Sequence, residues 1–103
     1  NLTKLIIDYI RLKGGFSTRI TSTGTYRSDI KKFIPSTQRN GMADIISIIN
    51  GKSISIEVKI GKDIQSKHQK KVENEINIAG GYYMIARNFD QFLFDFNNII
   101  KKF

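Results

Sequence analysis

Cysteine is absent from this chain of 103 residues, which excludes disulfide bridges, thiolate metal sites and cysteine nucleophiles. Long apolar runs are also lacking, since no stretch approaches the roughly 20 residues that a membrane-spanning helix requires. The chain does not open on a signal-peptide pattern. Proline and histidine each occur once. A chain of this length predicts one folded domain over residues 1–103 with a modest core, and a fold without disulfides fits an intracellular setting.

Acidic residues are scarce relative to basic ones. There are 9 Asp and Glu against 17 Lys and Arg, which gives a formal net charge of +8 and a pI near 9.9. Such an excess favours polyanionic partners, because each neutralised phosphate releases condensed counterions. Nucleic acid is therefore the partner class that the composition favours. Solubility alone, or binding to an anionic membrane surface, are the alternatives.

Apolar spacing and glycine positions predict an α/β fold in the order α-β-β-β-α-β-α. The segment 22–40 is polar and contains the single proline, so we expect a long loop there; loops of that length in small domains are usually functional or disordered. The expected fold has an α-β-β-β-α-β core, with a mixed sheet flanked by helices, and a C-terminal helix. The expected helices are 2–12, 66–79 and 89–103, and the expected strands are 16–21, 42–49, 52–60 and 82–86.

The segment "GMADIISIINGKSISIEVK", residues 41–59, predicts a β-hairpin whose register follows from its turn. Asn50-Gly51 is the strongest short-range signal for a two-residue hairpin loop, since both positions accept a positive φ. This turn places Asp44 directly opposite Glu57 and Met42 opposite Lys59. Side chains alternate along a strand, so Glu57 and Lys59 share one face. The other face carries the apolar residues Ala43, Ile45, Ile49, Ile54, Ile56, Val58 and Ile60, interrupted by Ser47 and Lys52.

Two carboxylates facing each other across a strand pair require an explanation, because like charges in that position repel. If Asp44 and Glu57 are partly buried, one of them should be protonated or a cation should lie between them. A hard divalent cation needs a carboxylate or two, further oxygens and room for water. The alternative is a solvent-exposed pair, or a separate basic partner for each carboxylate. The presence of Lys59 on the same face favours a metal site.

The pattern Gly-x-x-Asp, a short gap and Glu-x-Lys resembles the PD-(D/E)XK nuclease superfamily. The continuation through Ser66-Lys67-His68-Gln69 into a helix, followed by "GGYYMIA", resembles the VRR-NUC family, the small nucleases of phages. The resemblance covers roughly residues 2–95. Two features depart from it: Ala43 replaces the proline of the superfamily name, and the Val-Arg-Arg motif is missing. The family often has an acidic ligand on the first helix, whereas Asp8 lies on the polar side, so that ligand is missing, replaced or trimmed away.

Two residues near the start of the helix 66–79 have competing interpretations. Ser66-x-x-Gln69 is a capping-box pattern, yet Gln69 also faces inward on the stripe of Val72 and matches a glutamine that lies beside the catalytic lysine in the family. His68, the only histidine, is a tempting general base. It points about 100° away from Gln69 around the helix, so we expect a solvated surface residue.

The resemblance implies an endonuclease dependent on Mg²⁺ or Mn²⁺ that cleaves branched DNA, such as flaps or Holliday junctions, as a homodimer in an intracellular, phage-type setting. The alternatives are a non-catalytic nucleic-acid-binding module on the same fold and a basic interaction domain. Asp44, Glu57 and the carbonyl oxygen of Val58 would hold the metal, and Lys59 and Gln69 would complete the catalytic set. The residues expected to bind DNA are Arg19, Arg27, Lys31, Lys32, Arg39, Lys67 and Lys70.

Overall fold

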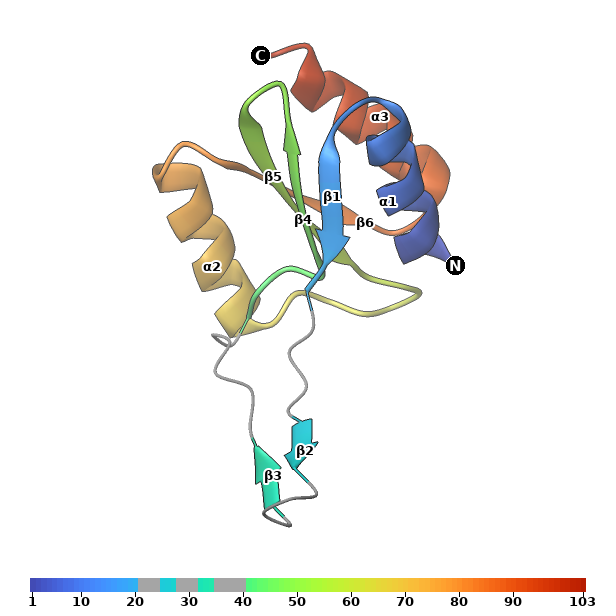
Figure 1. Cartoon of the computed structure of the whole chain (residues 1–103). Helices are drawn as coiled ribbons and strands as arrows, with labels where there is room; N and C mark the ends of the chain where they lie inside the picture. Colours follow the sequence, from blue (N-terminus) through green and yellow to red (C-terminus); the bar gives the residue numbers. More distant parts are fainter. Residues whose placement is uncertain (21–24, 28–31, 35–40) are drawn as a thin grey trace.

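The computed structural model describes residues 1–20, 25–27, 32–34 and 41–103. Its centre is a mixed four-stranded sheet in the order β1-β4-β5-β6 (Figure 1). The strand β4 (Ile45–Ile49) pairs antiparallel with both β1 (Phe16–Arg19) and β5 (Lys52–Val58), and β6 (Tyr82–Ala86) runs parallel to β5. The helices are α1 (Leu2–Leu12), α2 (Lys67–Ile78) and α3 (Phe89–Ile100). This confirms the predicted α/β class, the helix positions and the mixed sheet.

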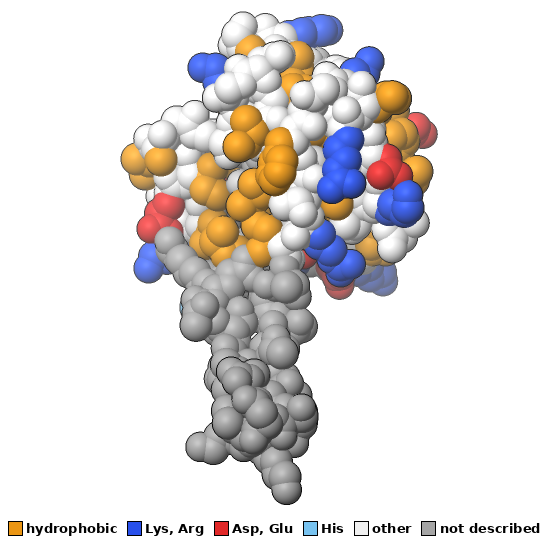
Figure 2. Space-filling model, viewed as in Figure 1, with side chains coloured by type: hydrophobic (Ala, Val, Ile, Leu, Met, Phe, Trp, Pro, Cys, Tyr) orange, Lys and Arg blue, Asp and Glu red, His pale blue; other side chains and the backbone are white. Residues whose placement is uncertain are grey.

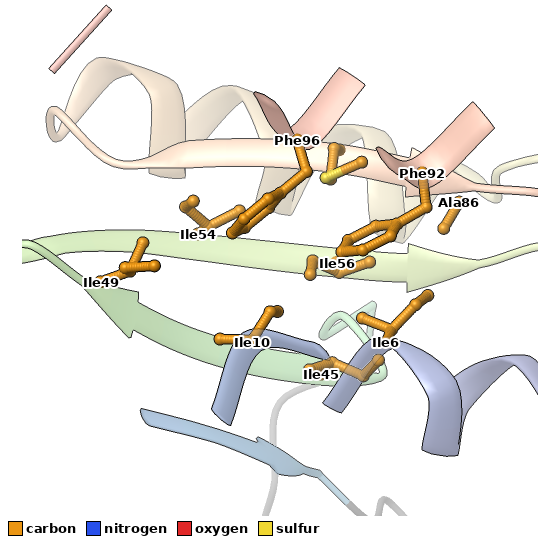
Figure 3. Packing of buried hydrophobic residues seen from close by; sticks show 10 residues of the cluster. Ile6, Ile10, Ile45, Ile49, Ile54, Ile56, Ala86, Phe92 and Phe96 are labelled. Atoms are coloured by element: carbon orange, nitrogen blue, oxygen red, sulfur yellow. The ribbon is translucent and has the colours of Figure 1, made fainter. Parts of the chain in front are cut away.

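The main hydrophobic core lies between the sheet and the pair of helices α1 and α3 (Figure 3). Isoleucines of β4 and β5 supply the sheet side, and Phe92 and Phe96 of α3 stack with ring centroids 5.2 Å apart. The predicted core face of the hairpin is therefore confirmed for Ala43 and the four strand isoleucines, all of which are buried. Ile60 is an exception at 57% exposed, because the chain leaves the sheet after Val58. The core cluster is Ile6, Ile10, Ile45, Ile49, Ile54, Ile56, Met84, Ala86, Phe92 and Phe96.

The predicted hairpin register is confirmed. Asn50 and Gly51 form the loop with φ values of 52° and 76°, and Ile49 pairs with Lys52 while Ile45 pairs with Ile56. The next residues along this register are Asp44 and Glu57. On the core face, Ser47 hydrogen-bonds to the hydroxyl of Ser17 at 3.0 Å. Each of these two buried hydroxyls thus has a partner, which explains why a serine is tolerated among isoleucines.

The second face of the sheet is only partly covered. Helix α2 packs against β6 on this face, where Val72 of the helix and the strand residues Ser55 and Glu57 are buried. Phe16 and Ile48 pair across β1 and β4 on this face and are 57% and 46% exposed. Figure 2 shows apolar side chains gathered on the side of the molecule that it presents, with Lys and Arg side chains beside them. Phe94 of α3 is also exposed.

The segment 22–40 differs from its predicted loop. Residues Thr25–Arg27 form β2 and Lys32–Ile34 form β3, an antiparallel pair in which Tyr26 lies opposite Phe33. In Figure 1 this ribbon projects from the end of the main sheet at which β1 ends. Each strand holds β-branched or aromatic residues, which favour strands, but three residues are too few to establish a period of two. Lys31 and Arg39 lie outside the described residues.

The open edge of β6 is closed by a side chain. The carboxamide of Gln91 donates from Nε2 to the carbonyl oxygen of Ile85 at 2.8 Å, and its Oε1 accepts the amide of Arg87 at 2.6 Å. These are the contacts that a neighbouring strand would make. Gln91 thus satisfies backbone groups that could otherwise pair with a further strand. Among the helices in the described ranges, none is long and apolar enough to span a membrane.

Candidate active site

The predicted site residues gather at the end of the sheet where β5 and β6 finish and β4 begins. Asp44 directly precedes β4, and the backbone amide of Val58 donates to its Oδ2 at 2.8 Å. The carbonyl oxygen of Asp44 accepts the amide of Ile20 at 2.8 Å. Contacts to both neighbouring strands therefore fix Asp44, and Val58 takes part in the site through its amide. Asp44 itself is partly exposed, which leaves it accessible from solvent.

Glu57 is buried on the face of the sheet that α2 packs against, with 2% of its surface exposed. Burial, together with the hydrogen bond and the negative charge of Asp44, raises the pKa of Glu57 to about 7. A hydrogen bond from Tyr83 and the positive charge of Lys59 act against the rise. The alternative of an exposed, harmless carboxylate pair is thus wrong for Glu57. The two carboxylates are close enough to share a proton or a cation.

A chain of polar side chains continues from Glu57 toward α2. The hydroxyl of Tyr83 donates to Oε2 of Glu57 at 3.1 Å. Gln65 hydrogen-bonds to Tyr83, and its Nε2 donates to Oε1 of Glu73 at 3.0 Å. No pattern in the sequence identified Gln65, Glu73 or Tyr83 as residues of this site. The parallel pairing of Tyr83 with Ser55 brings it to this face, and no turn signal announces the register of a parallel pair.

The start of α2 lies against the segment that leads into Asp44. Gly41 has a φ of 83°, and a Cβ atom there would lie 2.5 Å from the carbonyl carbon of His68. Only glycine accommodates both this backbone conformation and this approach. Ser66 caps α2 in a reciprocal capping box with Gln69, which confirms the structural interpretation of that pair. Oε1 of Gln69 accepts the Ser66 amide at 2.8 Å. His68 is exposed, as predicted.

The residues at this site fit a hard divalent cation. One oxygen of each carboxylate is engaged within the protein, Oδ2 of Asp44 by Val58 and Oε2 of Glu57 by Tyr83. The burial of Glu57 beside a second carboxylate is costly unless a proton or a cation compensates it. Within residues 1–20 and 41–103, no group of three or more His, Asp and Glu side chains could hold a metal. Mg²⁺ suits such a sparse site, because it keeps several waters and uses one or two carboxylates.

The remaining predicted residues that the structure describes lie on β1, on α1, on α2 and in the β2–β3 ribbon. Arg19 ends β1, and Lys67 and Lys70 lie in the first turn of α2; all three are exposed. Arg27 pairs with Lys32 across the β2–β3 ribbon. Asp8 forms an exposed ion pair with Lys4 on α1 at 2.7 Å, and this partner holds the pKa of Asp8 below its usual range.

A scan of the chain against protein-family models finds no match, and a search of curated proteins finds no match either.

Proposed function

We propose that this chain is a metal-dependent, structure-specific DNA endonuclease with a restriction-endonuclease-like fold of the VRR-NUC type. The observation that carries the proposal is a buried carboxylate, Glu57, beside a second carboxylate, Asp44, at the end of a sheet. Asp44, Glu57 and the carbonyl oxygen of Val58 would hold Mg²⁺ or Mn²⁺. When bound, the ion would polarise the scissile phosphate and lower the pKa of a bound water.

The side chains around the carboxylates have distinct proposed roles. Lys59 follows Glu57 at the end of β5, and its charge already lowers the pKa of Glu57, so it would also offset negative charge that builds up on the phosphate in the transition state. The carbonyl oxygen of the Gln69 side chain caps α2, which leaves the amide nitrogen as the group that would orient the attacking water.

The charge of the chain supports a DNA substrate. A net charge of +8 favours a phosphate backbone, and Arg19, Lys67 and Lys70 are exposed on elements that end or begin near the carboxylates. Contacts to phosphates position the substrate without reading its sequence, so we propose branched or junction-containing DNA as the substrate. Cutting both strands at a junction requires two active sites, which a homodimer would supply.

Cleavage assays test this proposal directly. The metal-free chain is incubated with labelled branched and linear DNA in Mg²⁺, Mn²⁺ or EDTA. We expect cleavage of branched DNA with either metal, and its loss in Asp44→Asn and Glu57→Gln, while DNA binding stays near that of the wild type or becomes tighter. Asp63→Asn, a change at an exposed acid outside the site, serves as the matched control. Equal activity in either site variant would rule out the assigned ligands.

Lys59 distinguishes an enzyme from a binding module. In single-turnover cleavage at saturating DNA, Lys59→Ala should lose activity by on the order of 10²–10⁴. In a gel-shift titration with Ca²⁺, the same variant should bind within a few-fold of the wild type. Full turnover with weakened binding would instead make Lys59 a phosphate contact, and the catalytic assignment would be wrong.

One observation favours the alternative, a nucleic-acid-binding module that does not cleave. In the part of the chain that the structure describes, the acid of the first helix, Asp8, is paired with Lys4 on an exposed surface, and the site has two carboxylates without a third. A wild-type chain that binds branched DNA but leaves it uncut under every metal condition would establish this alternative.

A further inference from the structure

We infer that Tyr83 is a positioning residue for Glu57: its hydroxyl holds one carboxylate oxygen within the protein and turns the other toward the divalent cation. This inference deepens the proposed function and rests on it. It concerns a residue of β6, a strand that contributes none of the proposed metal ligands. A substitution that removes only the hydroxyl would leave the aromatic ring in place.

The hydroxyl of Tyr83 is oriented by its surroundings. It donates to Oε2 of Glu57 at 3.1 Å, while Gln65 lowers the pKa of Tyr83, as a donor to the phenolic oxygen does. The Nε2 of Gln65 also donates to Glu73 at 3.0 Å. Because Gln65 is the donor to Glu73 through Nε2, and the same amide group donates to the phenolic oxygen, the hydroxyl of Tyr83 is left to donate to Glu57. The phenolic hydrogen therefore points to Glu57.

This arrangement restricts Glu57 in two ways. The hydroxyl of Tyr83 donates to Oε2 and thereby limits the rotation of the carboxylate. With Oε2 held, Oε1 is the oxygen of Glu57 that remains without a contact to Tyr83 and would face the cation. Carboxylates that bind metals are themselves commonly hydrogen-bonded, and loss of such an outer partner typically weakens metal affinity or activity by about 10–100-fold. Tyr83, which donates to Oε2 of Glu57, would be such an outer partner.

The test compares Tyr83→Phe with Tyr82→Phe in the full chain. Tyr82 is adjacent on β6, and its ring contacts Phe103 with centroids 5.3 Å apart. Mn²⁺ binding to the metal-free proteins is measured by calorimetry, beside thermal melts and the Mn²⁺ dependence of cleavage. We expect Tyr83→Phe to bind Mn²⁺ about 10–100-fold more weakly and to need correspondingly more Mn²⁺ for cleavage. Tyr82→Phe should match the wild type in both measurements.

Several outcomes would overturn the inference, and they separate it from the proposed function. If the wild type binds Mn²⁺ and Tyr83→Phe binds it equally well, Tyr83 has no positioning role, even where its melting temperature falls. If the wild type neither binds Mn²⁺ nor cleaves, the proposed metal site fails and this inference fails with it. Should Tyr83→Phe not fold, Gln65→Ala removes the donor behind the hydroxyl and should still weaken Mn²⁺ binding several-fold; unchanged binding there would also refute the inference.

Discussion

Replacing Glu57 with glutamine should stabilise the metal-free protein at alkaline pH. Burial and Asp44 raise the pKa of Glu57 from 4.5 to about 7, and each pKa unit corresponds to about 1.36 kcal/mol. The ionised side chain therefore costs the folded state up to about 3 kcal/mol. Folding takes up a proton between these two pKa values, so the wild type loses stability as pH rises from about 4.5 to 7, and the full cost is present above pH 7. Glutamine resembles the protonated acid and does not ionise, so the variant should not lose stability over this pH range.

The assay is thermal unfolding of the wild type and Glu57→Gln in EDTA from pH 4.5 to 8.5. Each kcal/mol shifts the melting temperature of a domain of this size by roughly 4–8 °C. We expect the variant to be more stable than the wild type at pH 8 by about 1–3 kcal/mol and to melt at a correspondingly higher temperature. The melting temperatures of the two proteins should converge toward pH 4.5. Asp63→Asn, an exposed control, should follow the wild type throughout. A variant that is equally stable or less stable at pH 8 would refute the argument that burial beside Asp44 destabilises ionised Glu57.

Further substitutions test the packing and the proposed DNA contacts. Gly41→Ala and Gly51→Ala both place a side chain at positive φ, which should lower the stability of either variant by roughly 1–2 kcal/mol. Only the new methyl group at position 41 would also contact the His68 backbone. Urea unfolding should therefore show the larger loss of stability for Gly41→Ala, and equal losses would disprove the close approach. Gln91→Ala removes two hydrogen bonds to the backbone at the edge of β6 and should cost about 0.5–1.5 kcal/mol, and a negligible loss would contradict that edge-closing role. In DNA-binding titrations, Lys67→Ala and Lys70→Ala should each reduce the slope of log K against log[salt] by about one phosphate contact, and unchanged slopes would exclude these contacts.

Local signals predicted much of the fold. Asn50-Gly51 set the hairpin register because a two-residue turn leaves one way to align its strands, and this placed Asp44 across from Glu57 before any tertiary contact was known. Ser66 and Gln69 marked the start of α2 because their capping contacts join residues three apart. The short strands β2 and β3 were missed, since three residues establish no periodicity.

The sequence by itself determined the α/β class, the apolar face of the hairpin and the pairing of two carboxylates, because each depends on residues close together in the chain. The tertiary structure alone decided that Glu57 is buried, since α2 packs against its face of the sheet and nothing in the strand pattern states which helix lies over which face. It also decided that Tyr83 and Gln65 reach the site. The parallel pairing of β5 with β6 joins segments separated by a whole helix, and the register of such a pair is fixed by packing against both layers rather than by a turn.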